Sequence, residues 1–158
     1  MKRVQGAGGL EPMYGFPQGA LAPWCPTTHS AKHMRALVID DSRAIRLILS
    51  RTLQELGFAT LEAANGKEAL TVLEREGPVE LALVDWNMPE MNGLEFVQAA
   101  RARPAWGSMR MMMVTTETEI ERVVKALEAG ADEYVMKPFT REVIAEKLAI
   151  LGLGTQAA

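Results

Sequence analysis

The side chains of this chain that could do chemistry stand directly after short runs of apolar residues. These side chains are Asp40, Asp41, Asp85, Thr115, Thr116 and Lys137. Taken singly, each type is ordinary: paired acids often stand at helix starts, aspartate favours turns and threonine favours strands. Their shared position is the informative feature, because the carboxyl ends of parallel strands meet at one edge of a sheet.

Three carboxylates at one sheet edge are typical of a site for a hard divalent cation. At a spacing of about 5 Å, each pair would repel by roughly 3 kcal/mol at an effective dielectric constant of 20. One carboxyl group would then stay protonated at neutral pH unless a cation were bound. The available ligands are oxygens, with no His or Cys near them in the sequence, which favours Mg²⁺ over Zn²⁺.

The same residues have the chemistry needed to accept a phosphoryl group. Phosphoryl transfer requires an in-line nucleophile, a cation that bridges the transferred oxygens, and donors for the charge that develops on them. Asp85 can serve as the nucleophile, Lys137 as the counter-charge and Thr115 as a hydroxyl donor. We therefore expect Asp85 to be a phosphoacceptor.

The elements that must position these residues alternate between strand and helix five times. We expect strands at 36–39, 58–63, 81–84, 111–114 and 134–136. We expect helices between Ser42 and Gly57, at 66–76, at 93–103, from 118 or 119 to 130, and from 140 to about 151. Wholly apolar strands joined by helices predict a parallel sheet covered on both faces, with function at the carboxyl ends of its strands.

The first 33 residues differ from the rest, being rich in Gly and Pro without helical or strand periodicity. We expect residues 1–33 to be a disordered extension, 34–151 to be the folded domain, and 152–158 to be a flexible C-terminal tail. One hypothesis is that Met34 is the native start and that the preceding residues come from an upstream start assignment. The alternative is a genuine but unstructured tail.

Composition narrows the class of protein. The net charge of −3 over 158 residues argues against nucleic acid as the main partner. No apolar run approaches the roughly 20 residues that span a bilayer, and the N-terminus lacks the apolar segment of a signal peptide. The single cysteine, Cys25, cannot form an internal disulfide. We expect a cytoplasmic, monomeric protein that binds neither membranes nor nucleic acid.

Residues 34–151 resemble a response-regulator receiver domain, and in particular the single-domain CheY-like chemotaxis regulators. The resemblance is carried by the run Asp-Trp-Asn-Met-Pro-Glu-Met-Asn-Gly at 85–93, together with the acid pair, Thr115 and the Lys-Pro-Phe run at 137–139. It implies an α/β fold of the flavodoxin-like type. In that fold, a doubly wound five-stranded parallel sheet of strand order 2-1-3-4-5 carries five helices.

The resemblance also implies roles for individual residues. Asp85 would receive its phosphoryl group from a phosphohistidine on a partner kinase. Mg²⁺ would be held by Asp41, by Asp85, by Asp40 largely through water, and by the backbone carbonyl of Asn87. Lys137 would pair with the phosphoryl group, and the peptide bond to the following Pro138 is expected to be cis.

A switch is implied as well. Thr115 would move to hydrogen-bond the phosphoryl group, and Tyr134 would change rotamer to fill the vacated space. The remodelled face would be the fourth helix, fifth strand and fifth helix, about 118–151.

The lifetime of the phosphoryl group should depend on Asn87 and Glu117, the polar pair that flanks the site in CheY-like proteins. Together they imply self-dephosphorylation in seconds to minutes. Thr116 is larger than the residue usual in CheY-like proteins and should narrow access to the phosphoryl group.

The resemblance implies a signalling protein that catalyses only its own phosphorylation and dephosphorylation. The leading hypothesis is chemotaxis, with a CheA-like histidine kinase, a flagellar motor switch protein and a phosphatase as partners. The alternative is a phosphorelay shuttle that passes its phosphoryl group to a histidine phosphotransfer protein. Because only seven residues follow Leu151, we expect output through protein contact. An aspartyl-phosphate hydrolase is disfavoured, because such enzymes need a general acid where this chain has Asn87.

Overall fold

The computed structural model describes residues 33–116 and 120–154. The expectations for the N-terminal extension, for Glu117 and for the last four residues of the tail lie outside the described residues. Within the described part, the fold continues beyond Leu151: the amide of Leu153 donates to the carbonyl of Leu148 at 2.8 Å, and its side chain packs against the core.

Five parallel strands form one sheet in the order β2-β1-β3-β4-β5, which confirms the predicted fold class. The strands are β1 (Arg35–Ile39), β2 (Ala59–Ala63), β3 (Leu81–Asp85), β4 (Arg110–Thr116) and β5 (Glu133–Lys137). The helices are α1 (Arg43–Glu55), α2 (Gly66–Glu76), α3 (Gly93–Arg101), the 3-10 turn η2 (Pro104–Trp106), α4 (Ile120–Ala129) and α5 (Arg141–Ile150).

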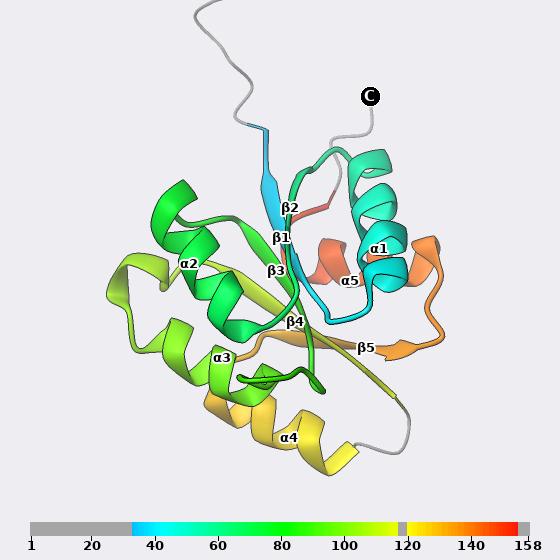
Figure 1. Cartoon of the computed structure of the whole chain (residues 1–158). Coiled ribbons are helices and arrows are strands. Elements are labelled where there is room, and N and C mark those ends of the chain that lie inside the picture. Colours follow the sequence, from blue (N-terminus) through cyan, green and yellow to red (C-terminus); the bar gives the residue numbers. More distant parts are fainter. Residues whose placement is uncertain (1–32, 117–119, 155–158) are drawn as a thin grey trace, which may run out of the picture. The chain divides into compact units, whose positions relative to one another are not determined.

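The helices cover both faces of the sheet, as Figure 1 shows, with α2, α3 and α4 on one side and α1 and α5 on the other. Successive residues of a strand point to opposite faces, so each central strand must be apolar at every position. In β1, Leu37 and Ile39 pack under α2 and α3, whereas Ala36 and Val38 pack under α1 and α5. This two-sided burial explains the continuous apolar runs of the sequence.

Side-chain caps fix where four helices begin. Ser42 accepts a hydrogen bond from the amide of Ile45 at 3.3 Å, and Asn92 accepts one from the amide of Glu95 at 2.9 Å. Asn65 and Thr140 cap α2 and α5 in the same way. Each cap satisfies an amide that has no partner within its own helix. The helices therefore start directly after the loops that leave the carboxyl edge of the sheet.

The elements β4 and α3 each differ from the sequence-based expectation by two residues at one end. The strand β4 spans Arg110–Thr116 rather than 111–114, because pairing with β3 and β5 continues through polar residues. The helix α3 ends at Arg101 rather than 103. Arg103 has extended backbone angles because the residue before a proline disfavours the helical region.

Candidate functional site

The predicted site residues gather at the carboxyl edge of the sheet. Asp40 and Asp41 directly follow β1, while Asp85 is the last residue of β3 and Lys137 the last of β5. In the parallel register, Ile39 pairs with Val84, which brings the ends of β1 and β3 side by side. The chain reverses its direction of winding between these two strands, and ligands of open α/β sheets bind at such a point.

The three aspartates form one cluster. A carboxylate oxygen from each of Asp40, Asp41 and Asp85 lies within 4.8 Å of the other two. Asp40 and Asp85 are buried, whereas Asp41 is exposed at the mouth of the cluster. Asp40 also accepts a hydrogen bond from the amide of Ser42 at 2.8 Å, which fixes its side chain at the start of α1. The cluster has the oxygen donors that a hard divalent cation needs.

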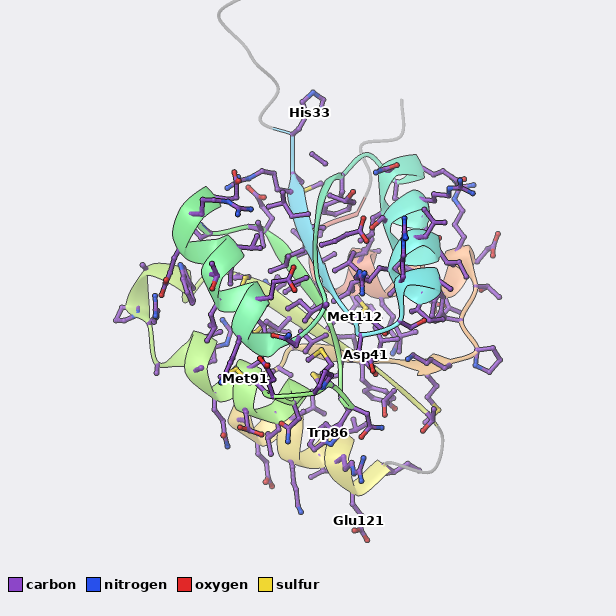
Figure 2. The ribbon with its side chains drawn as sticks, viewed as in Figure 1. His33, Asp41, Trp86, Met91, Met112 and Glu121 are labelled. Atoms are coloured by element: carbon purple, nitrogen blue, oxygen red, sulfur yellow. The ribbon has the colours of Figure 1, made fainter. Side chains whose placement is uncertain are left out.

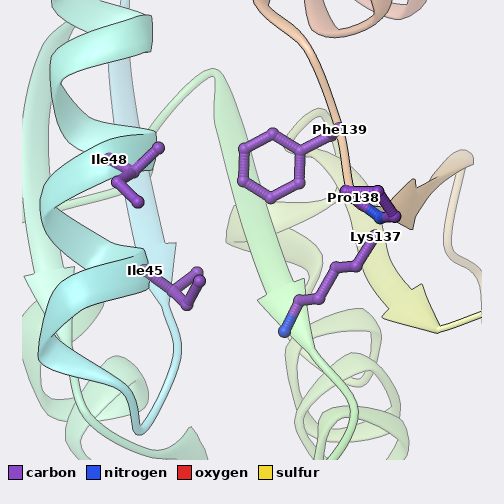
Figure 3. A pocket seen from close by; sticks show the side chains of 5 residues that line it. All are labelled: Ile45, Ile48, Lys137, Pro138 and Phe139. Atoms are coloured by element: carbon purple, nitrogen blue, oxygen red, sulfur yellow. The ribbon is translucent and has the colours of Figure 1, made fainter.

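Lys137 lies between two of these carboxylates. Its Nζ is 3.5 Å from Oδ2 of Asp40 and 3.4 Å from Oδ1 of Asp85. The peptide bond from Lys137 to Pro138 is cis, and Figure 3 shows the lysine extended from this turn toward the tip of β3. One ammonium group against three carboxylates leaves two negative charges when all are ionised. A divalent cation would balance them.

The environment of Asp85 disfavours its charge. Burial, and then the charge of Asp40, raise the pKa of Asp85 from 3.8 to about 6, against the lowering effect of Lys137. Burial raises the pKa of a carboxyl group because the charged form loses its hydration. A cation bound at the cluster would counter both effects and favour the ionised, nucleophilic form.

A hollow of about 460 Å³ lies beside Lys137, between α1 and the turn after β5. It is lined by Ile45, Ile48, Lys137, Pro138 and Phe139, which Figure 3 shows facing one another across the gap. The lining is apolar apart from the lysine. Apolar side chains of α1 therefore lie across this hollow from Lys137.

The two threonines of β4 occupy opposite faces of the sheet, because neighbouring strand residues alternate. Thr115 is buried on the face covered by α2, α3 and α4, in line with Met111 and Met113. Thr116 is exposed, shares the other face with Val114, and pairs in register with Lys137. Both hydroxyls stand at the expected edge, but they approach it from different faces.

Tyr134 lies on the same face as Thr115 and diagonally across from it, since Tyr134 pairs with Met113 and Thr115 pairs with Met136. The half-buried ring lines a hollow of about 160 Å³ against α4. On the α5 side, Nζ of Lys147 is 5.0 Å from the ring centroid. Tyr134 therefore contacts both helices of the predicted output face.

Sequence reasoning missed two residues near the site. Arg122 of α4 donates to Oδ1 of Asn87 at 3.1 Å and lies over the ring of Trp86, 5.6 Å from its centroid. Lys147, besides lying over Tyr134, is 3.2 Å from Oε1 of Glu133. Neither has a spacing signal in the sequence, because each contact joins side chains from separate elements.

A parallel sheet of this order, with an acidic pocket and a lysine at its carboxyl edge, defines a flavodoxin-like α/β domain of the CheY-like type. The chain belongs to the response regulator receiver domain family, whose sequence profile matches residues 36–149. Receiver domains are signalling domains. The resemblance noted in the sequence is thereby confirmed.

Relatives with similar sequences agree with this assignment. A chemotaxis protein CheY homolog of Campylobacter jejuni is 46% identical over 124 residues, which cover 77% of this chain and 95% of that protein. The chemotaxis protein CheY1 of Helicobacter pylori (strain J99) is 43% identical over 123 residues, covering 77% of this chain and 98% of that protein.

Solved structures agree as well. The high-resolution structure of chemotaxis protein CheY4 of Vibrio cholerae at low pH superposes with a TM-score of 0.70 at 35% identity, covering 75% of this chain and 98% of that one. None of the helices in residues 33–116 and 120–154 has the length and apolar character that crossing a bilayer requires.

Proposed function

We propose that this chain is a response regulator that accepts a phosphoryl group on Asp85 and thereby changes a protein-binding surface. The observation that carries the proposal is the cluster itself: Asp40, Asp41 and Asp85 lie within 4.8 Å of one another, and Lys137 reaches two of them. Three acids around one lysine leave an excess of negative charge, which costs free energy unless a cation balances it. A site that binds a cation and then a phosphoryl group makes use of that charge.

In the proposed reaction, a carboxylate oxygen of Asp85 attacks the phosphorus of a phosphohistidine on a histidine kinase. The new oxygen–phosphorus bond forms as the phosphorus–nitrogen bond breaks, and the electron pair returns to the imidazole, which takes up a proton. Lys137 pairs with the oxygens of the transferred group, as its present contact with Asp85 supports.

Asp40, Asp41, Asp85 and the backbone carbonyl of Asn87 are the proposed ligands of Mg²⁺, with Asp40 acting largely through water. When bound, Mg²⁺ would supply charge neutralisation for the acids and for the transferred oxygens.

The proposed switch couples Thr115 to Tyr134. A phosphoryl group on Asp85 adds negative charge and acceptor oxygens, which favour a hydroxyl donor from Thr115. The two residues share one face of the sheet, so movement of Thr115 alters the space next to the Tyr134 ring. The α4–β5–α5 face would then change, and it already exposes apolar side chains at Ile120, Val124 and Leu127.

Three further residues are proposed to set the lifetime of the phosphoryl group. Asn87 and Glu117 would govern hydrolysis, although Glu117 lies outside the described residues. Thr116, on the Lys137 side of β4, would narrow access to the site.

We assign this switch to chemotaxis, because the relatives reported above are named chemotaxis proteins. The proposed partners are a CheA-like histidine kinase and a flagellar motor switch protein, and the proposed location is the cytoplasm. Pull-down with and without beryllofluoride, a phosphoryl mimic, tests this assignment. Capture of a motor switch protein supports it, and capture of a histidine phosphotransfer protein instead would indicate a phosphorelay shuttle.

The acceptor assignment is tested by incubating the protein with acetyl phosphate and Mg²⁺ and recording its intact mass. Wild type should gain one phosphoryl group, about 80 daltons, and lose it after the donor is removed. Asp85→Asn should gain nothing while keeping its fold by circular dichroism. An adduct of equal yield in Asp85→Asn would overturn the assignment.

A further inference from the structure

Arg122 bridges the first turn of α4 and the loop that follows Asp85. Its Nη1 donates to Oδ1 of Asn87 at 3.1 Å, and its guanidinium carbon lies 5.6 Å from the centroid of the Trp86 ring. Trp86 and Asn87 are the two residues directly after the acceptor. The Arg122 side chain thus contacts the loop that follows Asp85 at two consecutive positions.

The electrostatics of α4 do not explain why a positively charged residue stands at this position. Arg122 is the third residue of α4, where the amide end of the helix dipole disfavours a positive charge. Its neighbour Glu121 has the sign that the dipole favours and is exposed to solvent, and Figure 2 shows it pointing away from the domain, opposite to Trp86. Arg122 is half-buried instead. Its contacts with the loop offset part of this cost.

The contact favours one orientation of the exposed Asn87 side chain. A carboxamide has an acceptor oxygen at one end and a donor NH₂ group at the other, and a hydrogen bond from a charged donor is stronger than one from a neutral donor. Because Oδ1 of Asn87 is directed to Arg122, the amide plane of Asn87 takes a defined orientation relative to Asp85, two residues earlier. The Trp86 ring, over which the guanidinium lies, helps to hold this donor in place.

We propose that Arg122 is a positioning residue for phosphoryl hydrolysis: it orients Asn87 beside Asp85 and so speeds loss of the phosphoryl group. The inference rests on the proposed function. In the step, a water oxygen attacks phosphorus, the bond from phosphorus to the Asp85 oxygen breaks, and its electron pair restores the carboxylate. Both protons of the water leave with inorganic phosphate. An oriented amide can hold this water in line, whereas a freely rotating one does so only part of the time.

The test compares rates of phosphoryl loss after labelling with acetyl phosphate and Mg²⁺ and removal of the donor, with intact mass as readout. Arg122→Met keeps the apolar stem but removes the donor, and should slow the loss about fivefold. Arg122→Lys keeps a charged donor and should recover at least half of the difference. Lys125→Met is the matched control, since it removes a positive charge from an exposed position of the same helix.

A double-mutant cycle separates positioning from general stability. In an Asn87→Ala background, Arg122→Met should cause no further slowing, because the side chain that it positions is gone. An equal loss rate in Arg122→Met and wild type, or a slowing that persists in the Asn87→Ala background, would overturn the role of Arg122 alone. Absence of any adduct in wild type would overturn the proposed function, and the role of Arg122 with it.

Discussion

Asp85 is held in a position that costs the folded protein free energy whenever its carboxyl group is ionised. Its pKa is raised from 3.8 to about 6, chiefly by burial and then by the charge of Asp40. The folded state therefore binds this proton more tightly than the unfolded chain does. The resulting stabilisation is present below pH 4 and is lost as the pH rises through 6.

Asp85→Asn should accordingly stabilise the metal-free protein at neutral pH. The neutral amide avoids the cost of a buried charge, and the gain in the free energy of unfolding should be ~1–3 kcal/mol at pH 7.5. The gain should shrink as the pH falls to 4, where wild-type Asp85 is itself largely protonated in the fold. Urea unfolding in EDTA at several pH values measures this, and a gain independent of pH would contradict the electrostatic account.

The residues that could be predicted from sequence are those whose position relative to a strand end is decisive. Asp85 and Lys137 each close an apolar run, so strand geometry alone brings them to one edge. Arg122 could not be found in this way, because its partner Asn87 is 35 positions earlier. That contact depends on how α4 packs against the loop that follows Asp85, which no local pattern encodes.

At the scale of elements, the start of α3 packs directly against the end of β3. The amide of Gly93 donates to the carbonyl of Trp86 at 2.9 Å, and a Cβ at position 93 would overlap the backbone oxygen of Asp85. Because the overlapped oxygen belongs to the backbone, no flexible side chain could move aside to make room. The loop that follows Asp85 is thus held between β3 and α3 by a close approach that only glycine permits.

Gly93→Ala should therefore destabilise the fold by about 2 kcal/mol, within the usual range for overpacking. Because the shift falls on Asp85, phosphorylation by acetyl phosphate should slow as well. Gly154→Ala is the control, since a Cβ there meets only ordinary contacts of 3.6 Å or more. Equal unfolding midpoints for the two variants in urea would show that α3 is not held in this way.

Element boundaries were predictable where a local signal marks them and not elsewhere. The helix α2 was predicted from its glycine and proline punctuation, and it spans the expected Gly66–Glu76. The strand β4 was predicted too short, since its threonines look like loop residues until pairing with β5 extends the ladder to Thr116. The turn Pro104–Trp106 was not predicted as a 3-10 helix, because proline signals only where α3 must stop.

At the scale of the whole molecule, the sheet brings together acids that are 45 residues apart in the sequence, at Asp40 and Asp85. Their repulsion opposes folding, and Lys137 offsets it only in part. The domain should therefore gain stability from any divalent cation that the cluster binds, since ligand binding to the folded state shifts the unfolding equilibrium.

Mg²⁺ should raise the free energy of unfolding by about 2.7 kcal/mol at a concentration of one hundred times its dissociation constant. Asp41→Asn should abolish most of this increase, because Asp41 is the exposed carboxylate at the mouth of the cluster. Glu95→Gln, an exposed acid on α3, is the control and should respond like wild type. A Mg²⁺ effect that survives in Asp41→Asn would point to a different binding site.

The most direct test of the phosphoacceptor site is chemical mapping of the modified residue. Protein labelled with acetyl phosphate and Mg²⁺ is treated with borohydride, which reduces an aspartyl phosphate to homoserine, and its peptides are sequenced by mass spectrometry. We predict homoserine at position 85, and none there when the donor is omitted. Homoserine at position 40 or 41 instead, or an intact aspartate at 85 in labelled protein, would contradict the account.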